Sequence, residues 1–543
     1  MTGLSIAYAM LFRLYGECMK LKEKINSLSR YELIALLFLT AQLILIFIFN
    51  IVCAPRYIDC DSAKLMEHII KMWEHKTLAI DNWYYSTTIE WDCTAMFAIP
   101  FYAVTKNIFF ACACSNLILA IIFARTVVFI FGKENRMASL IALSLIFFPW
   151  KLGTLEYFNM MFFAGAQYIV KVTTPLMLVG LLLYIVRNDT KEWWKKRGFM
   201  AMLIAFAFYL FVTTASSSVY VCATAVFPVV MVYILYRLKN WEKIKSSEVA
   251  VAIVMFVTVI VGFIINHAIL GGTRGDSMTY MSDSDVLENI RSGFLGIFQL
   301  FDAATPYEGA AVFDYYGIRM MVKLLFVVSW LICAVVILSR IIRGKAVLRD
   351  KFLMGIFLWN WFILMITDTR AGSQFCFEYR YFIIGVVPLI LEASILIYEY
   401  VKSMKAPKVL LFGIFLFFMT LIYVVEYREV YSYGEQNPNV YKIVDYFKDT
   451  DYERIYIYFE TNEADKLRLV GNPKHYIDIM DDGKTWAYDF YDWYKSGPIF
   501  PEGSALIIKK GFGFDEDTDF FGYHIVKYDE VGDYDIYSFV DYD

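Results

Sequence analysis

Charged residues are scarce in this sequence. Only 19% of its 543 residues are charged, whereas 59% are hydrophobic and 18% aromatic, and the mean hydropathy is +0.51. This composition excludes an ordinary soluble protein. There is no basic face and no nucleic-acid-binding motif, so we expect no nucleic acid partner. The nine cysteines include no CxxC pair, and the chain has neither a glycine-rich phosphate loop nor an internal repeat. Nothing therefore indicates a P-loop nucleotide site or a repeat architecture.

Long apolar runs fill most of the chain instead. Such runs predict membrane-spanning helices, and we place eleven of them at about 33–53, 107–131, 137–149, 168–187, 198–214, 216–237, 249–270, 319–341, 351–367, 381–401 and 408–426. Residues 93–106 are apolar but too short to cross, which predicts a re-entrant or interfacial helix. Residues 1–32 form a basic amphipathic arm. Because no small-residue cleavage site follows the first apolar run, we expect an uncleaved anchor and not a signal peptide.

The loops between these spans are basic on one side only. Lysines and arginines gather at 133–136, 187–197, 237–245, 340–351 and 402–408. The positive-inside rule then predicts a cytoplasmic N-terminus, and an odd number of spans puts the C-terminus outside. The loops 54–106, 150–167, 271–318 and 368–380 share the outer face. We interpret the charges in or beside the third of these loops as solvated, namely Arg274, Asp276, Arg291, Asp302 and Arg319.

Residues 427–543 have the composition of a water-soluble domain. They contain 12 lysines and arginines against 25 aspartates and glutamates. Alternating segments at 454–459 and 505–508 predict strands, and 439–448 and 485–494 predict helices. The predicted fold class is therefore an α-helical polytopic membrane protein, spanning at 33–426, with a small extracytoplasmic α/β domain at its C-terminal end.

The densest polar stretch, 54–99, lies in the first external loop, 54–106. Asp59 and Asp61 follow the first span, and two carboxylates this close suit either a general base or oxygen ligands for a divalent cation. The five residues Lys64, Glu67, His68, Lys71 and His75 recur at helical spacing, which predicts a helix along the membrane surface whose charged face meets water. His68 and His75 lack the three-ligand pattern of a zinc site, so we interpret them as surface residues.

Three motifs carry a resemblance to a known family. Asp61-Ser62-Ala63 with Glu67 six residues on resembles the first external loop of membrane glycosyltransferases of the GT-C class, in which an Asp begins an amphipathic helix. The run Trp83-Tyr84-Tyr85-Ser86-Thr87, and Glu378-Tyr379-Arg380-Tyr381 ahead of Pro388, are similar to motifs of bacterial members of that class. There are departures: Ser62 stands where many relatives carry a second acid, and Thr88-Ile89-Glu90 stands where relatives often carry an acid and then a base.

The resemblance implies a GT-C-like transmembrane domain and a function. Such enzymes move a sugar from a polyprenyl-phosphate donor to an acceptor hydroxyl at the outer face of the bacterial plasma membrane. The acceptor here would be an envelope glycan, lipid or protein. Asp61 or Asp59 would then be the base or a ligand of Mg²⁺ or Mn²⁺, a metal that we leave unassigned. Arg380 and Lys171 would bind the donor phosphate. The residues that would orient substrates are Glu378, Glu67, Trp83, Tyr84, Tyr85 and Glu90.

Simpler interpretations stay open for several of these residues. Arg380 and Lys171 could extend to the membrane surface, and the aromatic residues could form an interfacial belt. The alternative function is non-enzymatic: a transporter, flippase or scaffold for envelope polysaccharide. A transporter concentrates its polar groups near the bilayer midplane. Because the ionisable groups of this sequence gather at one face, the pattern favours interfacial chemistry.

Overall fold

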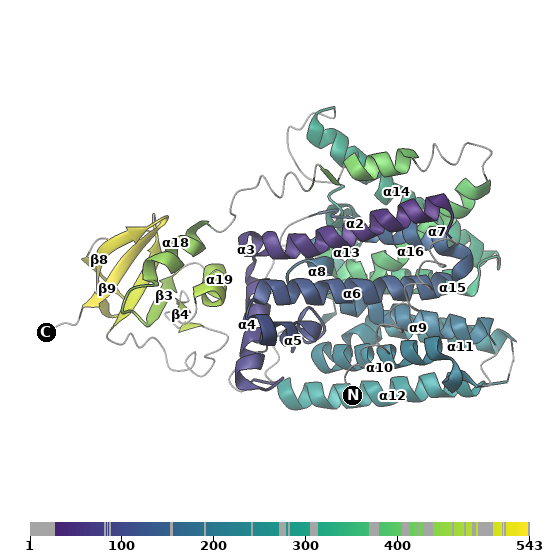
Figure 1. The fold of residues 1–543 in the computed structure, drawn as a ribbon, viewed down its shortest axis with the longest axis horizontal. Helices are drawn as coiled ribbons and strands as arrows, with labels where there is room; N and C mark the ends of the chain where they lie inside the picture. Colours follow the sequence, from purple (N-terminus) through teal and green to yellow (C-terminus); the bar gives the residue numbers. More distant parts are fainter. Residues whose placement is uncertain are drawn as a thin grey trace, which may run out of the picture.

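The computed structural model of the chain has two parts, a bundle of long apolar helices and a smaller domain built on a seven-stranded sheet, with helix α4 between them (Figure 1). The structure describes residues 28–80, 83, 85, 88–151, 156–188, 192–240, 243–270, 279–280, 283–303, 313–368, 379–403, 413–421, 423–424, 426, 438–458, 461–471, 474–479, 485–486, 503–512, 514 and 517–540.

Eight helices in this described part are long and apolar enough to cross a membrane, so the chain is a multi-pass membrane protein. Six of them are the single helices α2 (Arg30–Val52), α6 (Ile108–Phe131), α9 (Ile169–Arg187), α10 (Arg197–Ser217), α12 (Ser246–Leu270) and α14 (Tyr315–Ile342). The other two combine a short non-α turn with a helix: η3 (Cys222–Val226) with α11 (Phe227–Asn240), and η4 (Tyr379–Phe382) with α16 (Ile383–Ser403).

The predicted count of eleven spans is not confirmed. The expected span 137–149 is α7 (Arg136–Ile146), whose 11 residues cover only about 16 Å and cannot cross an apolar layer of about 30 Å. The expected span 351–367 is α15 (Leu348–Ile366), which opens with three charged residues, Arg349 to Lys351. The expected span 408–426 lies partly outside the described residues, and 413–421 is helical.

The first external loop forms three helices, α3 (Ala54–Tyr57), α4 (Cys60–His75) and α5 (Ala95–Thr105). The predicted helix through Lys64 and His75 is confirmed as α4, which runs across the ends of α2 and α6 (Figure 1). The short apolar helix expected at 93–106 is confirmed as α5, with 11 residues and Pro100 inside it.

Buried amide side chains fix the backbone on which α4 rests. Asn50 of α2 donates to the carbonyl of Phe162, and its own side-chain oxygen accepts from Asn116 of α6 and from the backbone N–H of Ala164. These bonds hold the turn after α8 (Tyr157–Phe162) inside the bundle, where its backbone groups would otherwise lack partners. In that turn, a Cβ added to Gly165 would meet Leu65 of α4. The helix α4 therefore packs directly on this turn.

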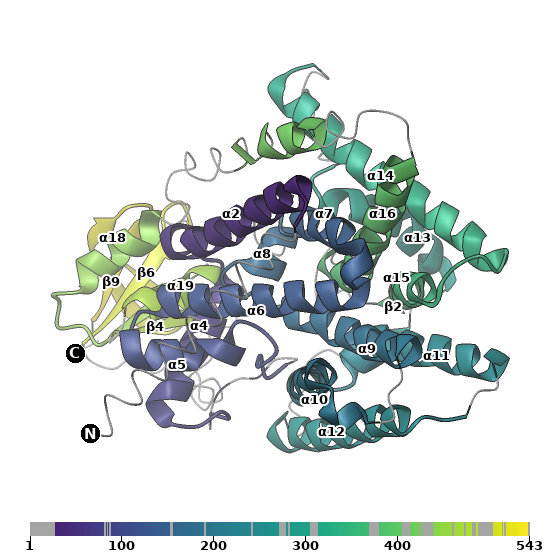
Figure 2. The same cartoon turned by 45° about the vertical axis from the view of Figure 1, so that its right-hand side comes forward.

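The remaining elements of the bundle bring late segments of the chain beside the early ones (Figure 2). The described part of the long loop 271–318 includes α13 (Asp283–Leu300), which packs against α15 and η4. A two-residue pairing of β1 (Thr279–Tyr280) with β2 (Thr367–Asp368) joins the approach to α13 to the end of α15. Short 3₁₀ turns are η1 (Lys133–Asn135) and η2 (Trp193–Lys195).

The C-terminal domain is an α/β sheet domain, as predicted. Its strands are β3 (Arg454–Tyr458), β4 (His475–Ile479), β5 (Thr485–Trp486), β6 (Ser504–Lys509), β7 (Asp517–Phe520), β8 (Tyr523–Val531) and β9 (Tyr534–Val540), in the order β5-β4-β3-β6-β9-β8-β7. β3 is parallel to β4 and to β6, and the other pairs are antiparallel. α18 (Pro438–Phe447) and α19 (Thr461–Gly471) complete the domain.

Both predicted strands and the first predicted helix of this domain are confirmed, but the helix at 485–494 is wrong where it can be examined. Thr485 and Trp486 form β5, which pairs with β4 with Asp478 opposite Trp486. β-branched and aromatic residues suit such an edge strand. Residues 487–494 lie outside the described part.

Candidate functional site

The site is built around the first turn of α4, where Asp59 and Asp61 have different environments. Asp59 is buried and caps the helix: its two carboxylate oxygens accept from the backbone N–H and the hydroxyl of Ser62, at 2.9 and 3.0 Å. Burial raises its pKa. The Asp61 side chain, in contrast, is 42% exposed. Asp59 is therefore committed to the helix start, and Asp61 is the carboxylate that a substrate can reach.

Arg380 lies directly beside Asp61. Its Nη1 is 3.5 Å from Asp61 Oδ2, although 319 residues separate the two in sequence. Arg380 is held by η4, because its neighbour Tyr379 fits against Gly296 of α13, where a Cβ would collide with the ring. Its guanidinium also lies 5.6 Å from the ring centre of Tyr381. The structure thus brings together Asp61 and Arg380, two distant residues that the sequence analysis had named as site residues.

One turn along α4, Lys64 makes a buried ion pair with Glu90, with 3.0 Å between Nζ and Oε1. Glu90 has a left-handed backbone (φ 63°), which is uncommon for a residue with a side chain. Burial raises the pKa of Glu90, while the nearby Lys64 ammonium acts in the opposite direction. Glu90 is therefore placed near Asp61 but is engaged by Lys64.

The interpretation of His68 as a surface residue is wrong. Its ring is fully buried, stacks on Trp83 at 4.8 Å between ring centres, and lies 3.3 Å from the hydroxyl of Tyr85. That hydroxyl also accepts from the backbone N–H of Ile80. Burial, helped by the charge of Lys64, lowers the His68 pKa to about 3, so the ring is neutral. Trp83 and Tyr85 are themselves buried and pack on α4; His75 is exposed, as expected.

Lys171 of α9 is also engaged. Its ammonium is 3.0 Å from Asp92 and donates to the carbonyl of Gln167 at 2.9 Å. Asp92 is buried and accepts in addition from the hydroxyls of Ser216 and Ser217, each at 2.8 Å. The sequence analysis missed Asp92. No local signal identified it, because the first external loop holds seven aspartates and glutamates and only tertiary packing determines which of them meets Lys171.

The C-terminal domain contacts the candidate site through α19, which packs on α4 in both views (Figures 1 and 2). The buried Arg468 guanidinium lies 3.5 Å from Glu67, forms an ion pair with Asp465, approaches Asp478 at 3.9 Å and donates to the Tyr476 carbonyl. Two further contacts join the domains: Leu469 packs into the core of the bundle, and the Tyr441 hydroxyl donates to the Pro55 carbonyl. The sequence analysis predicted a small domain on the outer surface but not its contact with α4.

These contacts correct the predicted surface helix. Lys64, Glu67 and His68 do not face water, because α19 and the described residues Trp83, Tyr85 and Glu90 cover their side of α4. The far end of the helix, at Glu74 and His75, is exposed, and so is much of the Asp61 side chain in the first turn.

A second buried cluster of charges joins α14 to Glu426, which follows the helical residues 413–421. Lys323 of α14 is fully buried, with Asp302 at 2.9 Å, Glu426 at 2.6 Å and the Trp150 carbonyl at 2.7 Å. Arg319 lies 3.1 Å from Asp302 and 3.6 Å from Glu426. The interpretation of Asp302 and Arg319 as solvated charges is therefore wrong. Arg291 is exposed, whereas Arg274 and Asp276 lie outside the described residues.

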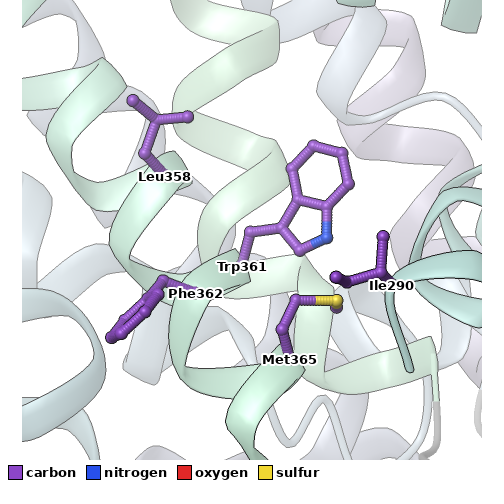
Figure 3. Close-up of a pocket in the computed structure, with 5 residues that line it drawn as sticks. All are labelled: Ile290, Leu358, Trp361, Phe362 and Met365. Carbon is purple, nitrogen blue, oxygen red and sulfur yellow. The ribbon is translucent and has the colours of Figure 1, made fainter. Parts of the chain in front are cut away.

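An apolar groove of about 210 Å³ lies between α13 and α15 (Figure 3). Its lining residues are Ile290, Leu358, Trp361, Phe362 and Met365. Trp361 also packs edge-to-face on Phe382, two residues after Arg380, with 6.3 Å between ring centres. The groove therefore lies near η4, the short turn that carries Arg380.

The arrangement does not fit the metal role considered for the two aspartates. No three His, Cys, Asp or Glu side chains of the described part are grouped so that they could hold a metal ion. Asp59, moreover, uses both carboxylate oxygens to cap α4. Two other predicted site residues, Tyr84 and Glu378, lie outside the described residues.

Comparisons with known proteins leave the family open. No family model matches this chain, and no curated protein matches it significantly. The resemblance to GT-C glycosyltransferases therefore stays a prediction based on the motifs.

Proposed function

We propose that this protein is a membrane glycosyltransferase of the GT-C type, which moves a sugar from a polyprenyl-phosphate donor to an envelope glycan, lipid or protein. The observation that carries the proposal is the contact of Asp61 with Arg380. A partly exposed carboxylate beside a guanidinium supplies the two groups that this chemistry needs, a proton acceptor and a partner for phosphate.

In the proposed reaction, Asp61 takes the proton of the acceptor hydroxyl as the acceptor oxygen bonds to the sugar C1. The bond from C1 to the phosphate oxygen breaks, and its electron pair leaves with the polyprenyl phosphate. Arg380 stabilises the charge that develops there, since a guanidinium matches phosphate oxygens in a bidentate manner. Arg380 is a better phosphate ligand than Lys171, because Asp92 and the Gln167 carbonyl already engage the Lys171 ammonium.

The apolar groove between α13 and α15 supports the donor assignment. Its apolar lining suits isoprene units, and Trp361 connects it to Phe382, close to Arg380. A polyprenyl chain in the groove would bring its phosphate toward Arg380. The basic loops on one side of the bundle support a cytoplasmic N-terminus and an extracytoplasmic C-terminal domain in a bacterial plasma membrane.

The alternative is a non-enzymatic transporter, flippase or scaffold for envelope polysaccharide, and the buried charges of α14 favour it. Lys323 lies about 12 Å into that helix at 1.5 Å per residue, which is deeper than the sequence analysis allowed for charge. The cluster pairs two cations with two carboxylates, however, and Lys323 has three acceptors for its three N–H groups. Such saturation is typical of a structural ion cluster.

The proposal is tested by sugar transfer in membranes supplied with an undecaprenyl-phosphate-linked sugar. Asp61→Asn should lower transfer about 100-fold or more, since general bases typically contribute factors of this size. Asp59→Asn is the matched control: Asn is also a good N-cap, so we expect near-normal transfer per folded molecule. Full transfer by Asp61→Asn would refute the assigned base. Transport of a lipid-linked sugar without transfer would favour the alternative.

A further inference from the structure

Two lysines converge on one indole at the far end of α4. The Lys76 Nζ lies 3.0 Å from the ring centre of Trp73, and the Lys106 Nζ lies 4.5 Å from the same centre and 5.7 Å from that of Tyr102. The two nitrogens can therefore be no farther apart than the sum of the first two distances. Lys76 ends α4 and Lys106 ends α5, each with a left-handed backbone.

Neither lysine of this pair has an acidic partner at ion-pair distance within the described part of the chain. The nearest acidic group on α4, Glu74, pairs with Lys71 at 3.6 Å. Neither Lys76 nor Lys106 forms an ion pair or side-chain hydrogen bond among the described residues, and both are exposed. Two ammonium groups at such a separation repel each other, and an anion between them removes that repulsion.

The surroundings of the pair are apolar and lie where a span begins. The candidate span α6 starts at Ile108, two residues after Lys106. Val104 is 84% exposed and Leu78 is 57% exposed on either side of the lysines. Asp61 lies fifteen residues earlier on α4 than Lys76, about 22 Å at the helical rise, so this cluster is separate from the site with Arg380.

We propose that Lys76, Lys106 and Trp73 bind the phosphate group of an anionic phospholipid. The phosphate oxygens contact the two ammonium groups, the Trp73 ring lies against both lysines, and the acyl chains lie along Val104 and Leu78. Charge complementarity and the position at the start of a span identify the ligand as a lipid and not a soluble anion. The inference does not depend on the proposed sugar transfer.

The test is native mass spectrometry of the full chain released from bilayers of phosphatidylcholine with or without phosphatidylglycerol. We expect wild-type protein to retain phosphatidylglycerol in preference to phosphatidylcholine. The double variant Lys76→Gln/Lys106→Gln should retain on the order of 20-fold less of it, since each interfacial lysine contributes a factor of about 5. Lys71→Gln is the matched control on the same helix and should retain it normally, because Lys71 already pairs with Glu74.

A second double variant, Lys76→Arg/Lys106→Arg, keeps both charges and should keep the lipid, which separates loss of charge from misfolding. Equal retention of phosphatidylglycerol by the Gln double variant and wild type would overturn the proposal. Equal retention of the two lipids by wild type would overturn it as well. Displacement of the lipid by millimolar inorganic phosphate would assign the site to a soluble anion and refute the lipid assignment.

Discussion

The contact between Glu67 and Arg468 belongs to a buried ionic cluster that joins the C-terminal domain to the bundle. We predict that this cluster stabilises the folded protein. Replacing Arg468 by Met leaves Glu67, Asp465 and Asp478 without their shared cation in a buried place. Removing one partner of a buried ion pair typically costs about 3–5 kcal/mol. Glu67→Gln is milder, about 1–3 kcal/mol, because Arg468 keeps its other partners.

The two substitutions should not be additive. Once Arg468 is Met, Glu67→Gln removes a buried charge that has lost this cation, so the double variant should be no less stable than Arg468→Met alone. The expected coupling energy is about 1–3 kcal/mol. Thermal unfolding of wild type, the two single variants and the double variant in detergent measures this coupling energy. Hydrogen exchange at α4 and α19 shows whether the two domains separate.

The matched control for this cycle is Glu74→Gln, seven residues further along α4. Glu74 is exposed and pairs with the neighbouring Lys71, so the change in stability should stay within about 0.5 kcal/mol. If Glu67→Gln and Arg468→Met were additive within about 0.5 kcal/mol, the two residues would act independently and the ionic account of docking would be refuted.

Three further predictions concern other parts of the bundle. In the unfolded chain His68 binds a proton near its ordinary pKa of about 6.5, whereas burial lowers its pKa to about 3 in the folded chain. The free energy of unfolding of wild type should therefore fall by about 2 kcal/mol between pH 7 and 5, and that of His68→Leu should not show this fall. Equal losses of the two proteins in denaturation curves would contradict the prediction. Lys323→Met should destabilise the protein by about 3–5 kcal/mol, because it leaves the buried Glu426 without this lysine. Adding Glu426→Gln should recover part of the lost stability in thermal melts. A further loss of stability would show that Lys323 does not stabilise the Glu426 carboxylate. Gly296→Ala should displace Tyr379 and, with it, the arginine that follows, lowering sugar transfer about tenfold or more; unchanged transfer would show that this packing does not position the site.

The sequence predicted those features that depend on local pattern. The 3.6-residue spacing from Lys64 to His75 located α4, and the alternation at 454–459 located β3. The pairing of Asp61 with Arg380 was anticipated only through the family motifs, because no local pattern relates residues 319 positions apart.

The failures at the candidate site share one physical cause. Periodicity shows which residues lie on one face of a helix but not what covers that face. The charged face of α4 meets α19 and the described residues Trp83, Tyr85 and Glu90 instead of water, so His68 is buried and Glu67 pairs with Arg468. The partners Asp92 and Arg468 were missed for the same reason: both come from distant segments whose position depends on tertiary packing.

The central claim is that Arg380 binds phosphate in competition with Asp61, and the binding of undecaprenyl phosphate to the purified chain tests it most directly. Arg380→Gln should weaken this binding about 10-fold or more, since it removes a charge-assisted contact. Asp61→Asn, although inactive in transfer, should bind at least as tightly as wild type, because Arg380 loses a competing carboxylate. Weaker binding by Asp61→Asn, or unchanged binding by Arg380→Gln, would contradict the account.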